Sequence, residues 1–257
     1  MDMDSTKKQE IHPETEIKTG KFEEELEEDD DPPTLSPYAL EALQQFIASQ
    51  SISKTQEEKE ADENDEDAMP LLPEDWRMSQ FWYSPQTAIT VSSEVSSLLS
   101  QFTCDGSDVA PPSVACISCP TLFIYLKKLY PTMSVQLLEY DKRFEKYGND
   151  FTFYDYNLPE DLPQSMKHTY QIVVADPPYL SEECLKKVAQ TIPFLAHPGK
   201  NFLLLLTGEV QKDRAAKLLG LRPCGFRPEH SSKLGNEFRL YTNYNPGERL
   251  GGWELEE

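Results

Sequence analysis

Four consecutive residues in the second half of the chain, Asp176-Pro177-Pro178-Tyr179, combine a carboxylate, two prolines and an aromatic ring. Proline has no backbone N–H and holds φ at about −65°, so the pair forms a rigid kink that presents backbone carbonyls and the carboxylate to one point. An amine held at that point can donate its hydrogens to these oxygens and direct its lone pair at an electrophile. The aromatic face beside it suits a cation. These residues therefore predict a site where an amine attacks a positively charged methyl donor.

Three other segments that are typical of buried strands, 113–118, 134–141 and 151–155, also end in polar residues. Those residues are Ser118, Cys119, Glu139, Asp141, Asp155 and Tyr156. An acid after a second strand can accept both hydrogens of a ribose diol, and an acid after a third strand can accept from the amine of adenine. Together the strand ends fit an adenosine-type cofactor, although for any one acid a role in a chain reversal is an equally good interpretation.

The elements that must position these residues follow from alternating apolar strands and helices. Helices are predicted over 85–99, 120–130, 181–195 and 209–220, and further strands over 172–176, 200–208, 224–230 and 236–245. Ser181 should cap the third helix and Gly220 should end the fourth. Such alternation predicts an α/β fold with a mainly parallel sheet that is covered on both faces. The last two strands lack a helix between them and should form an antiparallel hairpin at one end of the sheet.

Charge divides the chain of 257 residues, whose formal net charge is −21. Residues 1–75 hold 24 acidic and 6 basic side chains, so the remainder is nearly neutral. We expect a disordered acidic tail over 1–33, a short amphipathic helix over 34–50, an acidic linker over 51–70, a folded domain over 71–245 and a C-terminal tail over 246–257. The acidic part suits a cationic protein partner, although such runs are more often simply solvated.

Composition argues against several classes of protein. No basic stripe is available to meet phosphates, so stable binding of nucleic acid is not expected. No apolar run is long enough to span a bilayer and no signal peptide is recognisable, which predicts a cytoplasmic protein that does not bind membranes. The five cysteines should be reduced thiols, and Cys116 and Cys119 lack the second Cys/His pair that a metal site needs. Nothing in the pattern demands more than a monomer.

The tetrapeptide resembles the (Asp/Asn)-Pro-Pro-aromatic motif of class I methyltransferases that use S-adenosylmethionine to modify amino nitrogens. A sharper resemblance comes from LSPYALEALQQF, SQFWYS, EYDKRF, FTFYDYN, ADPPYLSEECL and NEFRLYTNY taken together. Over roughly residues 33–245 the chain resembles the elongation factor 1-alpha lysine methyltransferase 1 family, which was first described as adenine-specific DNA methyltransferases. The resemblance implies a Rossmann-like, seven-stranded class I fold, S-adenosylmethionine as methyl donor, and a lysine of the partner protein elongation factor 1-alpha as acceptor.

The resemblance also implies roles for individual residues. Asp176, Pro177 and Tyr179, with Pro178 between them, would orient the lysine amine; Asp141, or Glu139 on the same strand, would hold the ribose; Asp155 and Tyr156 would contact the adenine. Ser118 and Cys119 would lie against the cofactor, and Phe81, Trp82 and Tyr83 would close over the channel for cofactor or substrate. Core packing is an equally good interpretation of the three aromatic residues.

Three hypotheses of different kinds remain open at this point. The first is a protein-lysine methyltransferase, and the second is an N6-adenine methyltransferase on DNA or RNA, which uses the same motif chemistry. The third is an interaction protein with a decayed methyltransferase fold. Its best support is that the loop after the first strand, 118–121, has none of the glycines that class I enzymes carry there. The near-neutral domain disfavours the second hypothesis, and the acids at the later strand ends disfavour the third.

Overall fold

The computed structural model describes residues 72–78, 80–102, 111–178, 181–232 and 237–254. All described residues belong to one compact unit, residues 67–257. The predicted acidic tail, amphipathic helix and acidic linker lie outside the described residues, as does Tyr179. The boundaries that we expect for the folded domain therefore stay a prediction.

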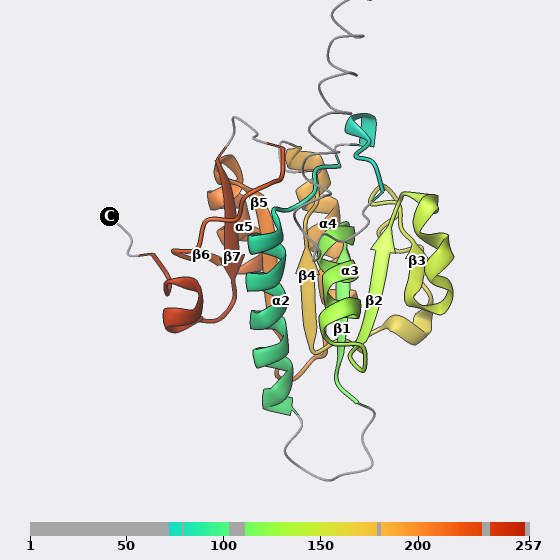
Figure 1. Cartoon of the computed structure of the whole chain (residues 1–257), viewed down its shortest axis with the longest axis horizontal. Coiled ribbons are helices and arrows are strands. Elements are labelled where there is room, and N and C mark those ends of the chain that lie inside the picture. Colours follow the sequence, from blue (N-terminus) through green and yellow to red (C-terminus); the bar gives the residue numbers. More distant parts are fainter. Residues whose placement is uncertain (1–71, 79, 103–110, 179–180, 233–236, 255–257) are drawn as a thin grey trace, which may run out of the picture. The chain divides into compact units, whose positions relative to one another are not determined.

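Seven strands form one sheet in the order β3-β2-β1-β4-β5-β7-β6 (Figure 1). The strands are β1 (Ser113–Ile117), β2 (Ser134–Glu139), β3 (Phe151–Phe153), β4 (Ile172–Ala175), β5 (Phe202–Gly208), β6 (Arg222–Pro223) and β7 (Phe238–Thr242). Strands β1 to β5 pair with one another in parallel, whereas β7 is antiparallel to both β5 and β6. The predicted α/β fold, with a mainly parallel sheet and an antiparallel end, is confirmed.

The range predicted for the sixth strand, 224–230, is wrong. The two residues before it, Arg222 and Pro223, pair with β7 instead. The chain then leaves the sheet, because the N–H groups of Gly225 and Phe226 donate to carbonyls near the C-terminus rather than to β7. Farther along, His230 forms an antiparallel bridge with Tyr83. The segment 224–230 therefore contacts the C-terminal residues at its start and Tyr83 near its end, and Tyr83 lies beside the strand ends.

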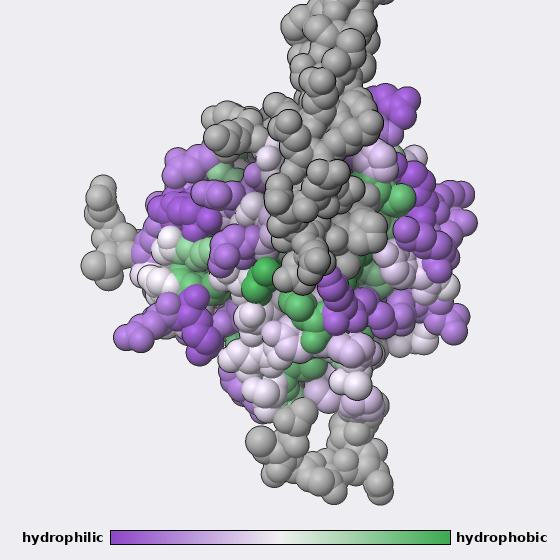
Figure 2. All heavy atoms as spheres, viewed as in Figure 1, coloured by the Kyte–Doolittle hydropathy of each residue, from purple (hydrophilic) through white to green (hydrophobic). Residues whose placement is uncertain are grey.

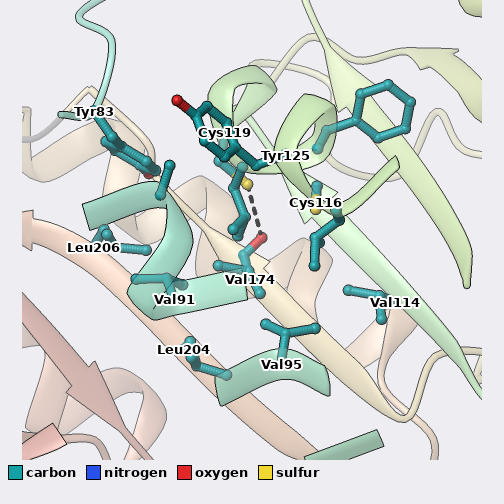
Figure 3. Packing of buried hydrophobic residues seen from close by; sticks show 14 of the residues in the cluster. Tyr83, Val91, Val95, Val114, Cys116, Cys119, Tyr125, Val174, Leu204 and Leu206 are labelled. Atoms are coloured by element: carbon teal, nitrogen blue, oxygen red, sulfur yellow. Dashed lines mark hydrogen bonds between the residues drawn. The ribbon is translucent and has the colours of Figure 1, made fainter. Parts of the chain in front are cut away.

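Helices cover both faces of the sheet (Figure 1). They are α2 (Pro85–Leu99) and α3 (Pro120–Leu129) on one face, and α4 (Glu182–Leu195) and α5 (Lys212–Leu219) on the other. Alternate strand residues point to opposite faces. Cys116, Val174 and Leu204 pack in the cluster beneath α2 and α3 (Figure 3), whereas Val173 and Leu205 pack beneath α4. The near-continuous apolar strands are thus buried on both sides, as a parallel sheet requires.

Local signals for helix ends agree with the structure. The Ser84 hydroxyl accepts from the N–H of Thr87 at 3.2 Å and Pro85 opens α2. The Ser181 hydroxyl likewise accepts from the N–H of Cys184 at 3.1 Å. Gly220 ends α5 in the left-handed conformation with φ +66°, as a C-terminal glycine should. The two predicted caps are therefore confirmed.

The residues after β7 pack against the end of the sheet. Trp253 donates its indole N–H to the Thr242 hydroxyl at 3.0 Å. Arg249 pairs with Glu94 of α2 at 2.6 Å, and the Tyr244 hydroxyl donates to the same carboxylate at 2.9 Å. Glu94 is only 2% exposed, so its charge depends on these two partners.

The surface of the described residues is mixed in polarity (Figure 2). On the face drawn in Figure 2, hydrophobic side chains form small areas among hydrophilic ones. Within the described ranges, no helix combines the length and the apolar character that crossing a bilayer requires.

Candidate active site

The carboxyl ends of β1 to β4 surround a cavity of about 460 Å³, which is a typical size for a small-molecule site. Its lining includes the predicted residues Phe81, Trp82, Tyr83, Ser118, Cys119, Glu139, Asp155, Tyr156, Asp176, Pro177 and Pro178. Of the predicted site residues that the structure describes, Asp141 alone does not line the cavity. The cavity therefore lies at the carboxyl ends of the parallel strands, where ligands bind in folds of this kind.

Asp176 follows β4 directly, and its N–H donates to the Ile117 carbonyl at 2.9 Å, which continues the ladder to β1. Tyr83, which is 2% exposed, donates its hydroxyl hydrogen to Oδ2 of Asp176 at 2.6 Å. Burial raises the pKa of Asp176 to about 8, although the Tyr83 hydrogen bond lowers it, and the charge of Glu139 raises it further. Oδ1 of Asp176 receives no hydrogen bond from the described residues, so it is available to a ligand.

The two prolines turn the chain away from the sheet. The Pro178 carbonyl accepts from the N–H of Ser181 at 3.2 Å, which leads the chain into the cap of α4. The carbonyls of Asp176 and Pro177 accept from no described residue. Two carbonyls and one carboxylate oxygen thus remain without a protein partner in the described structure.

Glu139 ends β2 and lies in the lining of the cavity. Oε1 accepts from the N–H groups of Tyr140 and Asp141 at 3.0 and 3.1 Å, whereas Oε2 has no partner among the described residues. Burial raises the pKa of Glu139 to about 7 against the effect of these two hydrogen bonds. A carboxylate with one anchored oxygen and one open oxygen is well placed to accept hydrogens from a diol.

Asp155 and Tyr156 follow β3 on the same side of the cavity. One oxygen of Asp155 accepts from the N–H of Asn157 at 2.8 Å, and the other has no partner in the described part of the chain. Tyr156 faces Lys187 from α4, whose Nζ lies 5.8 Å from the ring centroid. This end of the cavity therefore offers an open carboxylate oxygen beside an aromatic ring.

Asp141 has a different role, because it is 4% exposed and saturated with protein donors. It accepts from Nε2 of Gln80 at 3.0 Å and from Nε and the backbone N–H of Arg143 at 2.8 and 2.9 Å. Burial alone would raise the pKa of Asp141, but these hydrogen bonds outweigh it and lower the pKa. Because Gln80 precedes the aromatic segment, Asp141 anchors that segment to the end of β2.

The glycine-free loop still makes a tight turn. Ser118 adopts the left-handed conformation with φ +53°, which glycine normally supplies, and its N–H donates to the Leu138 carbonyl at 2.9 Å. Cys119 is 1% exposed and directs its thiol to the Val174 carbonyl at 3.6 Å (Figure 3). Burial raises the pKa of this thiol well above its usual value, so Cys119 is a packed residue that presents little polarity to the cavity.

The aromatic segment both packs in the core and lines the cavity. Trp82 donates its indole N–H to the Leu72 carbonyl at 2.6 Å and meets Phe144 edge to face. Tyr83 is the residue that reaches Asp176. Trp82 and Tyr83 thus belong both to the core cluster and to the cavity lining, and the role of the segment in closing a channel stays a prediction.

Sequence reasoning missed several lining residues, chiefly His230 and Tyr154. Tyr154 precedes the predicted pair and could have been found from that position. His230 stands in a segment whose apolar pattern resembled a strand, and no local signal marks it. In the described ranges no cluster of three or more possible metal ligands occurs.

This chain is similar to known proteins over a range that includes every residue lining the cavity. The sequence matches the family model described as probable N6-adenine methyltransferase over residues 74–246. EEF1A lysine methyltransferase 1 of Homo sapiens is 42% identical, covering 86% of this chain and 96% of that protein. The protein of the same name from Mus musculus is 44% identical with the same coverage. Protein-lysine N-methyltransferase CG9154 of Drosophila melanogaster is 38% identical, covering 86% of this chain and 98% of its own length.

Proposed function

The chain belongs to the EEF1A lysine methyltransferase 1 family, and we propose that it transfers methyl groups from S-adenosylmethionine to a lysine of elongation factor 1-alpha. The observation that carries this proposal is the Asp176 carboxylate, with one oxygen held by Tyr83 and the other open to a cavity. The enzyme works as a monomer in the cytoplasm and does not need stable contact with nucleic acid.

The end of the cavity near β2 and β3 fits the cofactor. The open oxygen of Glu139 accepts from the ribose hydroxyls, and we assign this role to Glu139 because the Asp141 carboxylate is occupied by Gln80 and Arg143. Asp155 and Tyr156 hold the adenine through its amine and its ring face. When bound, S-adenosylmethionine supplies an electrophilic methyl group on a sulfonium cation. The negative charges of Glu139 and Asp176 favour that cation.

The end of the cavity at β4 receives the lysine. A free lysine has a pKa of about 10.4, so its ammonium group must lose a proton before it can attack. Burial in the cavity beside another cation favours loss of this proton to solvent. The neutral amine then donates to Oδ1 of Asp176 and to the Pro177 carbonyl, which directs its lone pair at the methyl group. Most of the rate enhancement comes from this alignment.

A transfer assay with tritiated donor tests the proposal on purified elongation factor 1-alpha, RNA and DNA in parallel. We expect label in the protein alone, and loss of that label in Asp176→Asn, which keeps the shape of the side chain. Asp213→Asn, a matched change on exposed α5, should leave the rate unchanged. Label in nucleic acid with none in protein would overturn the substrate assignment, and full activity of Asp176→Asn would overturn the role of that carboxylate.

A further inference from the structure

His230 lies at the end of the cavity that faces away from the proposed cofactor contacts. The strand order places β2 and β3, which carry Glu139 and Asp155, on one side of β4 and places β7 on the other. The ring centroid of His230 lies 4.3 Å from that of Phe238, the first residue of β7, and the two rings are tilted by 38°. A molecule that reaches Asp176 from the β7 side therefore passes this histidine.

The backbone around His230 is held firmly against the aromatic segment. The N–H of Ser84 donates to the Glu229 carbonyl at 2.9 Å, and the N–H of Ser231 donates to the Trp82 carbonyl at 2.8 Å. The Ser231 hydroxyl adds a third hydrogen bond at 3.0 Å, to the Tyr83 carbonyl. These bonds flank the bridge between Tyr83 and His230. The histidine thus has a defined position next to the residue that holds Asp176.

Its side chain is surrounded by rings but lacks polar partners. Besides Phe238, the rings of Phe81 and Tyr83 each lie 6.0 Å from the His230 ring centroid. No described residue makes a hydrogen bond to its ring nitrogens, although the ring lines the cavity. Burial lowers the pKa of His230 to about 4, against the smaller opposing effect of the Glu74 charge. The imidazole is therefore neutral near pH 7 and offers one N–H and one lone pair.

We propose that His230 is a specificity-determining residue for the acceptor, and that its neutral ring accepts a hydrogen bond from the ammonium group of a lysine arriving at Asp176, through the hydrogen that this group loses before attack. Phe81 and Phe238 then contact the methylene groups of the same side chain. A charged imidazolium at this place would repel the incoming ammonium, so the apolar surroundings of the ring are part of the arrangement. This inference rests on the proposed lysine methyltransferase function.

Substitutions that separate the shape of the ring from its nitrogens test the inference. His230→Phe keeps an aromatic ring but removes the hydrogen bond, so we expect the KM for elongation factor 1-alpha to rise about tenfold. The Kd for S-adenosylmethionine, measured by calorimetry, should not change. His230→Asn or His230→Gln, which restore an acceptor, should recover most of the lost affinity. His197→Phe, the same change outside the cavity, should alter neither constant.

Three results would overturn the inference. They are an unchanged KM for His230→Phe, a loss of cofactor affinity as large as the loss of acceptor affinity, and amide variants that behave no better than His230→Phe. If the unaltered protein methylates elongation factor 1-alpha and one of these results is found, the inference alone fails. If the unaltered protein methylates no lysine, the proposed function fails and the inference fails with it.

Discussion

Replacing Tyr83 with phenylalanine removes one hydrogen bond from the Asp176 carboxylate and little else. The hydroxyl lies 2.6 Å from Oδ2 of Asp176 and makes no other hydrogen bond with described residues. The ring, which packs against His230 and Phe238, remains in Tyr83→Phe. The variant therefore isolates the effect of this contact on the ionised form of Asp176.

The expected magnitude follows from the charge on the acceptor. A hydrogen bond to a charged group contributes about 1.5–3 kcal/mol, and each 1.36 kcal/mol corresponds to about one pKa unit. Because the contact favours the carboxylate, its loss should raise the pKa of Asp176 from about 8 by about one to two further units. Less of the variant is then ionised near neutral pH, and the difference disappears at a pH above both pKa values.

The assay compares the two proteins as a ratio, with both substrates well below their KM values so that the rates report the free enzyme. Loss of the lysine proton affects the rates of both proteins equally, so its pH dependence cancels in their ratio. We expect Tyr83→Phe to be about 10- to 100-fold slower at about pH 7 and less than about fivefold slower at about pH 9.5. A ratio that is constant with pH would refute the reasoning, because it would show that Tyr83 acts through packing rather than through the titration of Asp176.

Two further predictions concern the cofactor end and the C-terminal residues. Burial raises the pKa of Glu139 to about 7, and the ribose hydroxyls need its ionised form, so S-adenosylmethionine should bind about tenfold more weakly at about pH 6 than at about pH 8. Calorimetry on Glu139→Gln should show weaker binding with a smaller pH dependence, because only Asp176 still titrates beside the cation, and an undiminished dependence would contradict the assignment. Arg249→Ala leaves the buried Glu94 charge with the Tyr244 hydroxyl alone. Since Arg249 is 49% exposed, we expect a loss of about 2 kcal/mol, less than for a fully buried pair. Urea denaturation measures this loss in the free energy of unfolding. An unchanged midpoint would show that water solvates the Glu94 carboxylate in the variant.

The parts of the fold that local pattern determines were predictable. Helix α2 has the bounds expected for it, 85–99, and the buried strands β1, β4 and β5 stand within two residues of their expected ranges. The short strand β6 was not predictable, because two residues carry no periodicity and are defined only by their pairing with β7. Its neighbours gave a false strand signal because they pair elsewhere.

The candidate site divides in the same way. Glu139, Asp155 and Asp176 were found because the ends of parallel strands meet at one edge. The sequence pattern did not show whether Glu139 or Asp141 lines the cavity. Side chains alternate between the two faces only within a strand, and β2 ends at Glu139. Asp141 turns back to cap the next helical turn at Arg143. His230 was missed because only contacts distant in sequence bring it to Asp176.

The glycine-free loop, which was the best support for a decayed fold, has a physical explanation that preserves the site. A serine in the left-handed conformation costs about 1 kcal/mol, and Ser118 gains a backbone hydrogen bond to Leu138 in return. Pro120 lacks an N–H, but it stands at the first position of α3, where that N–H has no partner within the helix. The turn after β1 is therefore made without glycine and still opens on the cavity. Loss of the glycines removes a sequence signature of class I enzymes while the turn itself remains, which favours an active enzyme over an interaction protein.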